Sequence, residues 1–357
     1  MKIGFVRRGH SATGGAEAYL LRLAKSLHSM GEETILITTR EWPAERWPFG
    51  EILRLPGKTP EEFAAAFKSS DTGCDVVFSM ERVPGCDVYR AGDGVHASWL
   101  ERRKAFEPFW KKLARLMNRK HSQMLALESK VFDSANTRVI IANSHLVRDE
   151  ILARFDFPAD RIHVVPNGIQ PIDNLPARAV ARESFGIPSD QFTVLFLGTG
   201  WERKGLRTAL RAVEMVDGAM LLVAGRGPAD AYRSRNAKFV GPVSEIGSLF
   251  AAADLMVLPT WYDPFSNACL EALSGGLPVI TTPANGFSEI ITPGVHGAIV
   301  PAGDSLVLAE EIEKWKTPSR CADAREACIR RANEFTIESN ARKTLEILRQ
   351  TASRQTA

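Results

Sequence analysis

Residues 193–213 read TVLFLGTGWERKGLRTALRAV. The run Thr193–Leu197 is short and apolar, which is typical of a buried strand. A loop with three glycines follows, and Leu206–Val213 then has the apolar spacing of a helix. A strand that leads through a glycine loop into a helix is the repeating unit of α/β folds with parallel sheets.

The same alternation occurs twice along the chain, before and after a break at residues 166–171. The expected strands are Lys2–Val6, Thr34–Thr38, Asp75–Ser79, Asp87–Arg90, Val139–Ala142, Thr193–Leu197, Met220–Ala224, Phe239–Gly241, Leu255–Leu258 and Val279–Thr281. The expected helices are Ala16–Met30, Leu206–Val213, Ile246–Ala251, Ala268–Leu273 and Thr336–Gln350. The break, PNGIQP, has the composition of a hinge or linker.

These patterns predict an α/β protein with two doubly wound, Rossmann-like domains that face each other across a cleft. A length of 357 residues also favours two domains over one. We expect one domain at residues 1–168 and another at residues 169–335. The C-terminal helix, at about residues 336–357, is expected to pack back on the first domain. Ligands of such sheets bind beyond the carboxyl ends of the strands.

The composition is that of a soluble globular protein, with 45% hydrophobic and 24% charged residues. A net charge of +3 is too small to indicate nucleic acid as a partner. The five cysteines show no C-x-x-C spacing, which favours a reduced, cytoplasmic location. The first residues predict a strand rather than a signal peptide, and no apolar run approaches the roughly 20 residues of a spanning helix.

Residues 263–271, DPFSNACLE, place two carboxylates eight positions apart. Asp263 precedes a proline and is therefore held out of a helical conformation, whereas Glu271 falls inside the following helix. The backbone N–H groups of Phe265, Ser266 and Asn267 fall at the start of that helix, where an anion is favoured. Such a loop could bind sugar hydroxyls, a phosphate and a ribose. An ordinary loop and helix with two solvated acids would have the same pattern.

Two further glycine loops follow expected strands. Arg203 and Lys204 lie in the loop after Thr193–Leu197, where fixed cations could stabilise the charge of a departing nucleoside diphosphate. A solvated Arg-Lys pair is the alternative. Gly14 and Gly15 open the first helix and would let its backbone N–H groups approach a phosphate. They do not form G-x-G-x-x-G, so the dinucleotide fingerprint of an oxidoreductase is absent.

Asp93 follows the strand Asp87–Arg90 and stands between two glycines. Its carboxylate could orient an acceptor hydroxyl, and His96 is a second candidate for this role. An aspartate between glycines is also a common turn residue. Cys269 is expected to pack inside its helix, because the sequence places no base beside it.

With these residues assembled, the chain resembles family 4 of the retaining glycosyltransferases, which have the two-domain GT-B fold. The resemblance runs in family order through nearly the whole chain, and within the family the stretch from Asp87 to Asp93 with its basic continuation resembles the lipopolysaccharide core glucosyltransferases. The matching motifs are Gly14-Gly15-Ala16-Glu17, Ile141-Ala142-Asn143-Ser144, Val165-Pro166-Asn167-Gly168, Arg203-Lys204-Gly205, Phe239-Val240-Gly241, Ala252-Ala253-Asp254 and the acidic pair around Pro264.

The resemblance implies roles for the residues named above. It implies catalytic roles for Asp93, Asp263 and Lys204. The implied donor-binding residues are Arg203 and Lys204 at the diphosphate, Glu271 at the ribose, Phe265, Ser266 and Asn267 at the sugar and distal phosphate, Gly14 and Gly15 at the phosphates from the other domain, and Val240 and Pro242 at the base. No metal and no cofactor are implied, since the nucleotide sugar is a co-substrate. The family has Glu at the first acid of the pair, where this chain has Asp263.

Residues 99–121 contain eight basic and two acidic residues. From Pro108 onward, aromatic and apolar residues recur with helical spacing opposite the cations, which suits an anionic membrane surface. A helix that faces the core with a solvated basic face has the same pattern. No base-reading motif supports nucleic acid as a partner.

The sequence therefore predicts a cytoplasmic, peripheral membrane glycosyltransferase. Its expected substrates are a nucleotide-sugar donor, UDP-glucose, and a glycolipid or core-oligosaccharide acceptor of lipopolysaccharide, with retention of configuration. Two alternatives stay open. One is a mannosyl-, galactosyl- or hexosaminyltransferase for another glycan. The other is a non-catalytic sugar-nucleotide-binding protein on the same fold, since a fold alone does not give an activity.

Overall fold

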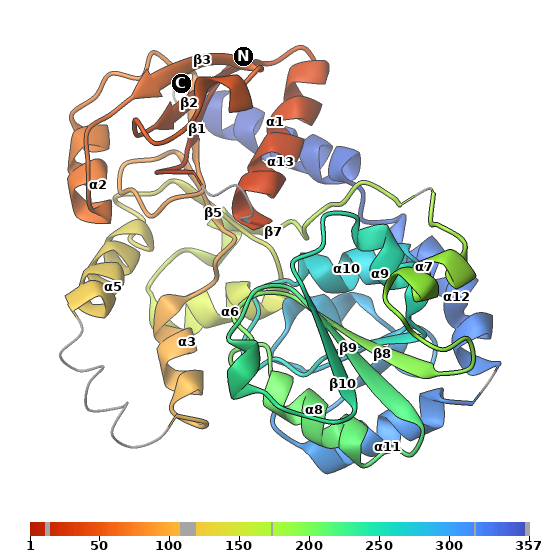
Figure 1. Cartoon of the computed structure of the whole chain (residues 1–357). Coiled ribbons are helices and arrows are strands. Elements are labelled where there is room, and N and C mark those ends of the chain that lie inside the picture. Colours follow the sequence, from red (N-terminus) through yellow and green to blue (C-terminus); the bar gives the residue numbers. More distant parts are fainter. Residues whose placement is uncertain (11–14, 108–118, 173, 318, 354–357) are drawn as a thin grey trace. The chain divides into compact units, whose positions relative to one another are not determined.

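A computed structural model describes residues 1–10, 15–107, 119–172, 174–317 and 319–353 (Figure 1). The chain divides into two compact units. Unit 1 consists of Met1–Gly168 together with the segment from Ile337 onward, and unit 2 consists of Ile169–Thr336.

Unit 1 is an α/β unit whose helices and strands alternate. Its strands are β1 (Lys2–Val6), β2 (Glu33–Thr38), β3 (Gly50–Arg54), β4 (Val76–Ser79), β5 (Val88–Ala91), β6 (Val139–Ala142) and β7 (Ile162–Val164). Its α-helices are α1 (Gly15–Ser29), α2 (Pro60–Lys68), α3 (His96–Arg103), α5 (Arg119–Val131), α6 (His145–Arg154) and α13 (Ile337–Ser353), with 3-10 helices η1 (Ala44–Arg46) and η2 (Ala159–Arg161).

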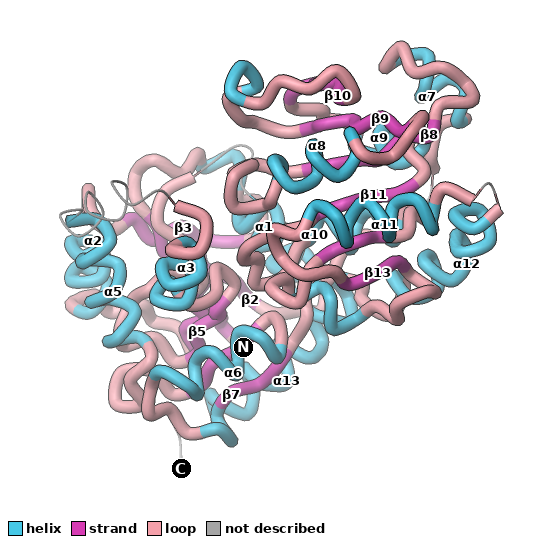
Figure 2. Tube along the Cα trace, turned by 90° about the horizontal axis from the view of Figure 1, so that it is seen from below, coloured by secondary structure: helices cyan, strands magenta, loops and turns pink. Residues whose placement is uncertain are grey.

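The described strands of unit 1 form a parallel sheet in the order β3-β2-β1-β4-β5-β6-β7. Figure 2 labels β2, β3, β5 and β7 of this sheet. Alternate residues of each strand point to opposite faces, so Ile3 and Phe5 belong to one core and Val6 to the other. Helices α1 and α13 lie side by side on the Phe5 face (Figure 1). Residues of α2, α5 and α6 cover the opposite face.

Unit 2 repeats this plan with a shorter sheet. Its strands are β8 (Phe192–Leu197), β9 (Ala219–Ala224), β10 (Ala237–Gly241), β11 (Leu255–Leu258), β12 (Val279–Thr281) and β13 (Gly297–Ile299). Its helices are α7 (Arg178–Ser184), α8 (Leu206–Glu214), α9 (Ile246–Ala252), α10 (Asn267–Ser274), α11 (Ser305–Trp315) and α12 (Arg320–Ala332), with η3 (Ala229–Ala231) and η4 (Gly286–Ile290).

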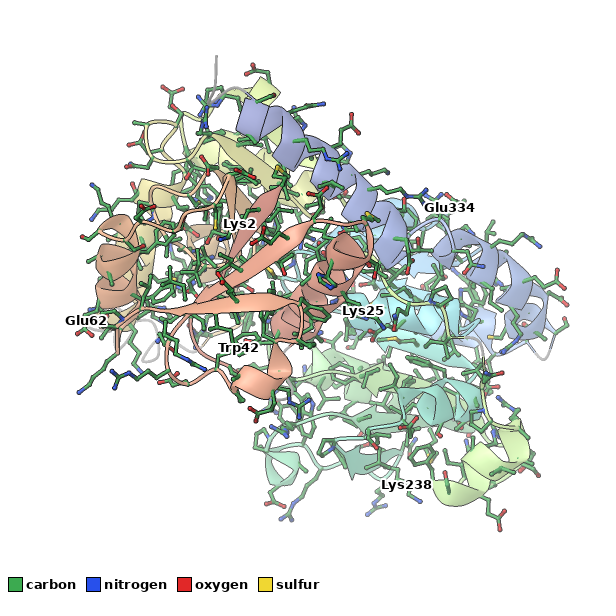
Figure 3. All side chains as sticks on the ribbon, turned by 90° about the horizontal axis from the view of Figure 1, so that it is seen from above. Lys2, Lys25, Trp42, Glu62, Lys238 and Glu334 are labelled. Atoms are coloured by element: carbon green, nitrogen blue, oxygen red, sulfur yellow. The ribbon has the colours of Figure 1, made fainter. Side chains whose placement is uncertain are left out.

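The described strands of unit 2 are also parallel, in the order β10-β9-β8-β11-β12-β13. The chain starts at β8 in the middle of this sheet, builds outward to β10, and then returns to build β11 on the other side. Neighbouring strands β8 and β11 therefore form a topological switch point, where loops at the carboxyl ends diverge and leave room for a ligand. At one edge of the sheet, Lys238 of β10 donates from Nζ to the carbonyl of Gly186, at 3.4 Å (Figure 3).

The predicted fold class is confirmed: the chain is an α/β protein with two Rossmann-like parallel sheets. Each expected strand and helix that falls in the described residues is present, with ends that differ by at most three residues. The sequence did not predict β3, β7 and β13. Edge strand β3 contains only two apolar side chains, β7 has a histidine between its two apolar residues, and β13 begins at a glycine, so none is a continuous run of large apolar side chains.

Candidate functional site

The ammonium group of Lys204 lies 3.2 Å from Oδ2 of Asp263, and both side chains are about nine-tenths buried. Lys204 belongs to the loop between β8 and α8, whereas Asp263 belongs to the loop between β11 and α10. The ion pair therefore joins the two loops at the switch point of the unit 2 sheet. The Arg203 guanidinium lies 3.8 Å from the same carboxylate oxygen and also donates to the Tyr262 carbonyl at 2.6 Å.

Glycines shape the loop that carries the two cations. Gly205 begins α8 with a φ of +81°, and a Cβ there would lie 2.1 Å from the carbonyl oxygen of Pro259. At Gly198, with a φ of +151°, a Cβ would lie 2.7 Å from a carbon of the Lys204 side chain. Both positions thus combine a left-handed backbone with close neighbours, so side chains there would displace the loop and Lys204 with it.

Two opposing effects set the ionisation of Asp263. Burial raises the pKa of its carboxyl group, but the charges of Lys204 and Arg203, with hydrogen bonds from Lys204 and from the backbone N–H of Phe265, outweigh it. The pKa of Asp263 therefore lies below its ordinary value, and the group is a carboxylate at neutral pH. Two cations and one carboxylate give the cluster a formal charge of +1.

Backbone hydrogen bonds fix the Asp263 loop against its neighbours. The Asp263 N–H donates to the carbonyl of Ala284, and the Gly286 N–H donates to the carbonyl of Asp263. The buried side chain of Asn285 accepts from the Ser266 N–H at 3.2 Å, while the Ser266 hydroxyl caps α10. Two of the amides that the sequence predicts at a phosphate, those of Phe265 and Ser266, therefore donate within the chain.

The remaining residues predicted in unit 2 follow the carboxyl ends of its strands. Glu271 is half-buried on α10, the helix that begins at the third predicted amide, Asn267. Val240 lies in edge strand β10 and is half-buried, and Pro242 follows that strand and is exposed. The Gly225 N–H, after β9, donates to the carbonyl of Gly241, which joins these two strand ends.

In unit 1, Gly14 lies outside the described residues, and Gly15 is the first residue of α1. A Cβ at Gly15 would meet no described atom within 4 Å. Asp93 is exposed in a turn closed by a hydrogen bond from the Gly94 N–H to the Ala91 carbonyl, as the turn alternative predicts. Its Oδ2 also lies 4.0 Å from Nη1 of Arg7.

His96 and Cys269 are both engaged with neighbouring side chains. Nε2 of His96 lies 3.0 Å from Nδ1 of His121, across α3 and α5. Burial, then the charge of Arg82 and the neighbouring His121, lower the pKa of His96 to about 4, so the ring is neutral at pH 7. Burial raises the pKa of Cys269 to about 12, which makes it an unreactive thiol, in line with the packing role expected for it.

The structure adds residues that the sequence did not single out. Asn285 supports the Asp263 loop from the segment after β12, and three side chains of unit 1, Arg7, Glu17 and Glu81, gather near Asp93. These residues are separated from their partners by 10 to 86 positions, and no local motif marks the contacts. Among these residues, the sequence could have marked Arg7 alone as a site candidate, because it directly follows a buried strand, where α/β folds bind ligands.

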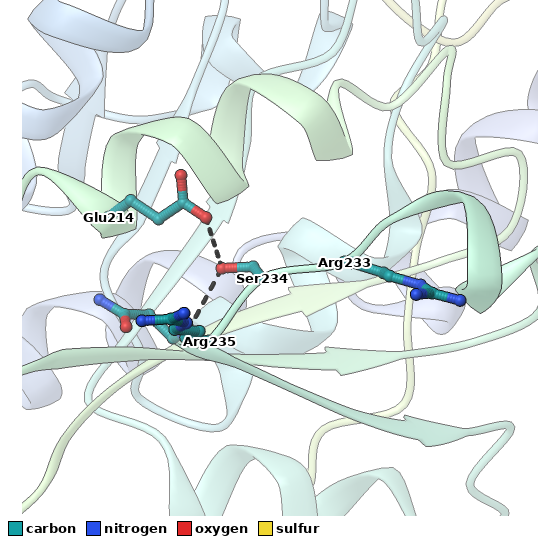
Figure 4. A pocket seen from close by; sticks show the side chains of 5 residues that line it. Glu214, Arg233, Ser234 and Arg235 are labelled. Atoms are coloured by element: carbon teal, nitrogen blue, oxygen red, sulfur yellow. Dashed lines mark hydrogen bonds between the residues drawn. The ribbon is translucent and has the colours of Figure 1, made fainter.

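A surface pocket of unit 2 is lined by Glu214, Arg233, Ser234, Arg235 and Asn236 (Figure 4). The Ser234 hydroxyl donates to Glu214 at 2.7 Å and accepts from the Asn236 N–H at 3.3 Å. This pocket precedes β10 and lies at the amino ends of the strands, whereas the predicted donor-binding residues of unit 2 follow the carboxyl ends. It contains none of the predicted site residues.

The basic segment 99–121 is only partly described. Helix α3 ends at Arg103 and α5 begins at Arg119, whereas the amphipathic helix expected from Pro108 onward lies mainly outside the described residues. In the described part, Arg102 pairs with Glu150 at 3.0 Å and Arg103 pairs with Glu107. Lys104 is exposed. Two of the cations are thus partly neutralised by carboxylates of unit 1.

Neither a metal-binding cluster nor a membrane-spanning helix is found in the described part of the chain. No three His, Cys, Asp or Glu side chains gather there in an arrangement that could hold a metal ion, and independence from metal stays a prediction. No helix found there has the length and apolar character needed to cross a membrane.

Two family models match the chain, and together they span most of it. Residues 13–171 match the model described as Glycosyltransferase Family 4, and residues 191–316 match the model described as Glycosyl transferases group 1. Two parallel-sheet units with basic and acidic loops at a switch point fit this class of enzyme. The chain belongs to the family 4 glycosyltransferases, with the GT-B fold.

Individual relatives agree with this assignment. The lipopolysaccharide glucosyltransferase WaaG of Escherichia coli K12 is 23% identical over 84% of this chain and 85% of its own length. The crystal structure of WaaG, a glycosyltransferase involved in lipopolysaccharide biosynthesis, matches with a TM-score of 0.80 at 22% identity, over 97% of this chain and 99% of that one. HepE of Anabaena in complex with UDP-glucose matches with a TM-score of 0.74 at 17% identity, over 100% and 99% of the two chains.

Proposed function

We propose that this glycosyltransferase transfers glucose from UDP-glucose to a sugar of the lipopolysaccharide inner core, with retention of anomeric configuration and without a metal ion. The observation that carries the proposal is the buried Lys204–Asp263 pair, with Arg203 beside it, at the switch point of the unit 2 sheet. Phosphate oxygens and sugar hydroxyls are the ligand groups that such a cluster binds.

The charge of the cluster suits a nucleoside diphosphate. Its formal charge of +1 attracts a dianion, and Arg203 and Lys204 offer the N–H donors that phosphate oxygens accept. As the bond between sugar and phosphate breaks, negative charge grows on the departing diphosphate. A lysine held in place before the reaction stabilises that charge at little reorganisation cost. Because Lys204 and Arg203 supply this charge, the proposal assigns no step to a metal ion.

Asp263 has two roles in this proposal. It pairs with Lys204 and so fixes the direction of the ammonium group, and its carboxylate accepts hydrogen bonds from hydroxyls of the donor glucose. Its low pKa keeps it an acceptor throughout the physiological range. The amides of Phe265 and Ser266 already donate within the chain. We therefore assign binding of the distal phosphate to Arg203 and Lys204 in preference to these amides.

The other donor-binding roles follow from the positions of the residues. Glu271, on the helix that follows Asp263, holds the two ribose hydroxyls, and the strand end at Val240 and Pro242 receives the base. In unit 1, the N-terminus of α1 at Gly15 offers backbone N–H groups to a phosphate. Asp93 orients the acceptor hydroxyl from the loop after β5.

The choice of substrates is supported by the relatives. HepE was crystallised with UDP-glucose, and WaaG is named as a lipopolysaccharide glucosyltransferase. At these identities, another hexose remains a second candidate, and the specific observation in its favour is Asp263. The family has Glu at this position, and a shorter side chain reaches less far toward a sugar hydroxyl.

The proposed setting is the cytoplasmic face of a membrane, with the segment 99–121 on anionic lipid. Lys104 and Lys120 are exposed cations of its described part, and Lys111 and Lys112 lie between them in the sequence. A lipid-linked acceptor makes such a contact useful, because it keeps the enzyme at the surface that holds the substrate.

The experiment that tests the proposal is a transfer assay with separate nucleotide sugars and a core-oligosaccharide acceptor, in excess chelator. We expect the glucose of UDP-glucose to reach the acceptor in its original anomeric configuration, as read by NMR of the product. Inversion, rescue by Mg²⁺ or Mn²⁺ alone, or faster transfer from another donor would each contradict the corresponding part of the proposal. Binding of the donor with no transfer and no hydrolysis would favour the non-catalytic alternative.

A further inference from the structure

The guanidinium of Arg7 contacts carboxylates from three other elements of unit 1. Arg7 directly follows β1, and its partners are Glu17 on α1, Glu81 after β4 and Asp93 after β5. Strands β1 and β4 are neighbours in the middle of the sheet, and the chain builds outward from them in opposite directions. The cluster therefore stands at the switch point of the unit 1 sheet, where an α/β unit binds ligands.

The two edges of the guanidinium have different partners. Nε and Nη2 face one oxygen of Glu17, at 3.4 Å and 3.1 Å. Nη1 donates to the carbonyl of Met80 at 3.4 Å and lies 3.9 Å from Glu81 and 4.0 Å from Asp93. Because a guanidinium is planar and rigid, the contact with Glu17 determines where Nη1 lies relative to the other two carboxylates.

The members of the cluster differ in burial, with Glu17 the most buried and Asp93 by far the most exposed. The side chains of Arg7, Glu17 and Glu81 are 16%, 9% and 16% exposed, whereas that of Asp93 is 55% exposed. One cation faces three carboxylates, so the formal charge of the cluster is −2. An arrangement of this sign suits hydroxyl groups, which donate to carboxylates.

We propose that Arg7 is a positioning residue of the acceptor-side site, which holds Glu81 and Asp93 together so that both carboxylates accept hydrogen bonds from hydroxyls of the acceptor sugar. The proposal rests on the acceptor role assigned to Asp93 above and adds Glu81 as a second carboxylate. Two carboxylates this close repel each other, and the cation between them reduces that repulsion. Glu17 contributes by fixing Arg7 and is not itself presented to the substrate.

The cluster gives the pH dependence of transfer a definite sign. Burial raises the pKa of Glu81, Arg7 and then Arg8 lower it, and Asp93 raises it; Arg82 is a further cation near this group. The net result is a raised pKa for Glu81. Loss of the Arg7 charge raises it further, so the carboxylate form is lost at a higher pH. Loss of the Glu17 charge leaves Arg7 with fewer competing anions. Arg7 then stabilises the Glu81 carboxylate more strongly, so the pKa of Glu81 falls.

The test compares Arg7→Gln, Glu17→Gln and Arg8→Gln with the parent protein. Arg8 is a matched control, because its backbone N–H, and not its guanidinium, contacts Glu81, while its side chain donates to the carbonyl of Lys58. Three quantities are measured: the acceptor KM, the rate of donor hydrolysis without acceptor, and the ratio of transfer rates at pH 5.5 and pH 7.5.

For Arg7→Gln we expect the acceptor KM to rise about tenfold or more, with donor hydrolysis within about twofold of the parent. The transfer rate at pH 5.5 divided by the transfer rate at pH 7.5 should fall by about threefold or more. Glu17→Gln should leave this ratio equal or higher, and Arg8→Gln should change it less than Arg7→Gln does. Arg7→Lys, which keeps the charge, should have a pH ratio close to that of the parent protein. Its acceptor KM should return only in part to the parent value.

Two outcomes would overturn the proposal. In the first, Arg7→Gln keeps the parent acceptor KM and pH ratio. In the second, Arg7→Gln and Glu17→Gln lower transfer and donor hydrolysis to the same extent and move the pH ratio in the same direction, as expected of a purely structural ion pair. The proposed function is tested separately by Asp93→Asn. If that variant loses transfer while Arg7→Gln does not, only the inference about Arg7 fails.

Discussion

Lys204 and Asp263 stand 59 positions apart in the sequence, yet their charged groups lie 3.2 Å apart in the interior of unit 2. The positive charge is in excess, because Arg203 adds a second cation beside the same oxygen. An ion pair of this kind is weak evidence for stability, since removing two charged groups from water is costly. Its position at the carboxyl ends of β8 and β11 indicates a role in binding, and the predictions below start from it.

The pair predicts how the stability of the protein depends on pH. The pKa of Asp263 is lower in the folded chain than its unfolded value of 3.8, so the unfolded chain binds the proton more readily. The stabilisation is therefore fully present above pH 3.8 and is lost as the pH falls through the lower folded pKa. We expect the urea midpoint to fall more steeply between pH 4 and pH 2 for the parent than for Asp263→Asn.

Asp230→Asn is the matched control for this measurement, because Asp230 is exposed. It should follow the parent curve. If the parent and Asp263→Asn lose stability with the same slope in acid, Asp263 has no lowered pKa and the ion pair is not formed in solution.

Glu271 is predicted to hold the ribose of the donor. Replacing it by alanine should weaken nucleotide-sugar binding about tenfold or more, because a hydrogen bond to a charged group contributes about 1.5–3 kcal/mol. Calorimetric titration with UDP-glucose measures the change. Glu326→Ala on α12 serves as control, since this side chain is exposed and pairs with Arg330 on the surface. Parent-like affinity of Glu271→Ala would remove Glu271 from the site.

Asp93→Asn separates the acceptor side from the donor side. The substitution keeps the shape of the side chain and removes its charge, so transfer should fall about 10²-fold. Binding of free nucleotide should stay the same, because the donor cations belong to unit 2. Equal losses in transfer and in nucleotide binding would assign Asp93 to the donor site. No loss in either would leave it the turn residue that the Gly94–Ala91 hydrogen bond also describes.

The basic segment predicts binding to anionic lipid. Each cation near such a surface contributes about 1 kcal/mol, so the triple change Lys104→Gln, Lys111→Gln and Lys112→Gln should weaken partitioning about 100-fold. The matched control neutralises three exposed lysines of other unit 1 helices, Lys25, Lys68 and Lys130. Co-sedimentation with anionic and zwitterionic vesicles, at low and high salt, measures the difference.

Three results of the vesicle experiment matter. The parent protein should co-sediment with anionic vesicles at low salt and dissociate from them at high salt. The segment variant should bind less than the control variant, and it should still transfer sugar to a soluble acceptor fragment. A parent protein that ignores anionic vesicles at low salt, or two variants with equal binding, would contradict the lipid contact.

Local patterns were enough to predict most of the fold. A buried parallel strand such as β8 is a continuous apolar run, and a helix such as α1 repeats its apolar residues on one face, so both can be read from a few neighbours. Strand β3 could not be found in this way. It is an edge strand with two charged residues, and its pairing with β2 is what makes it a strand.

In the candidate site, too, local patterns predicted individual residues but not the contacts between them. Arg203, Lys204 and Asp263 were predicted because each lies in a loop that leads from the carboxyl end of a strand to a helix, where ligands bind. Their mutual contact depends on the order of β8 and β11 in the sheet, which no local pattern contains. The contacts of Arg7 were missed for this reason: Asp93 was predicted by itself, but Arg7, Glu17 and Glu81 come from three other elements.

The most direct test of the donor site is the turnover of UDP-glucose by Lys204→Ala, measured beside the parent and beside Lys314→Ala. Lys314 is an exposed lysine of α11 that pairs with Glu311, so its loss removes the same charge from unit 2 away from the predicted donor-binding residues. If Lys204 stabilises the departing diphosphate, its variant should stay folded and lose about 10²–10³-fold in rate, while Lys314→Ala keeps the parent rate. Turnover of UDP-glucose by Lys204→Ala at the parent rate would contradict the assignment of the Lys204–Asp263 pair as the donor site.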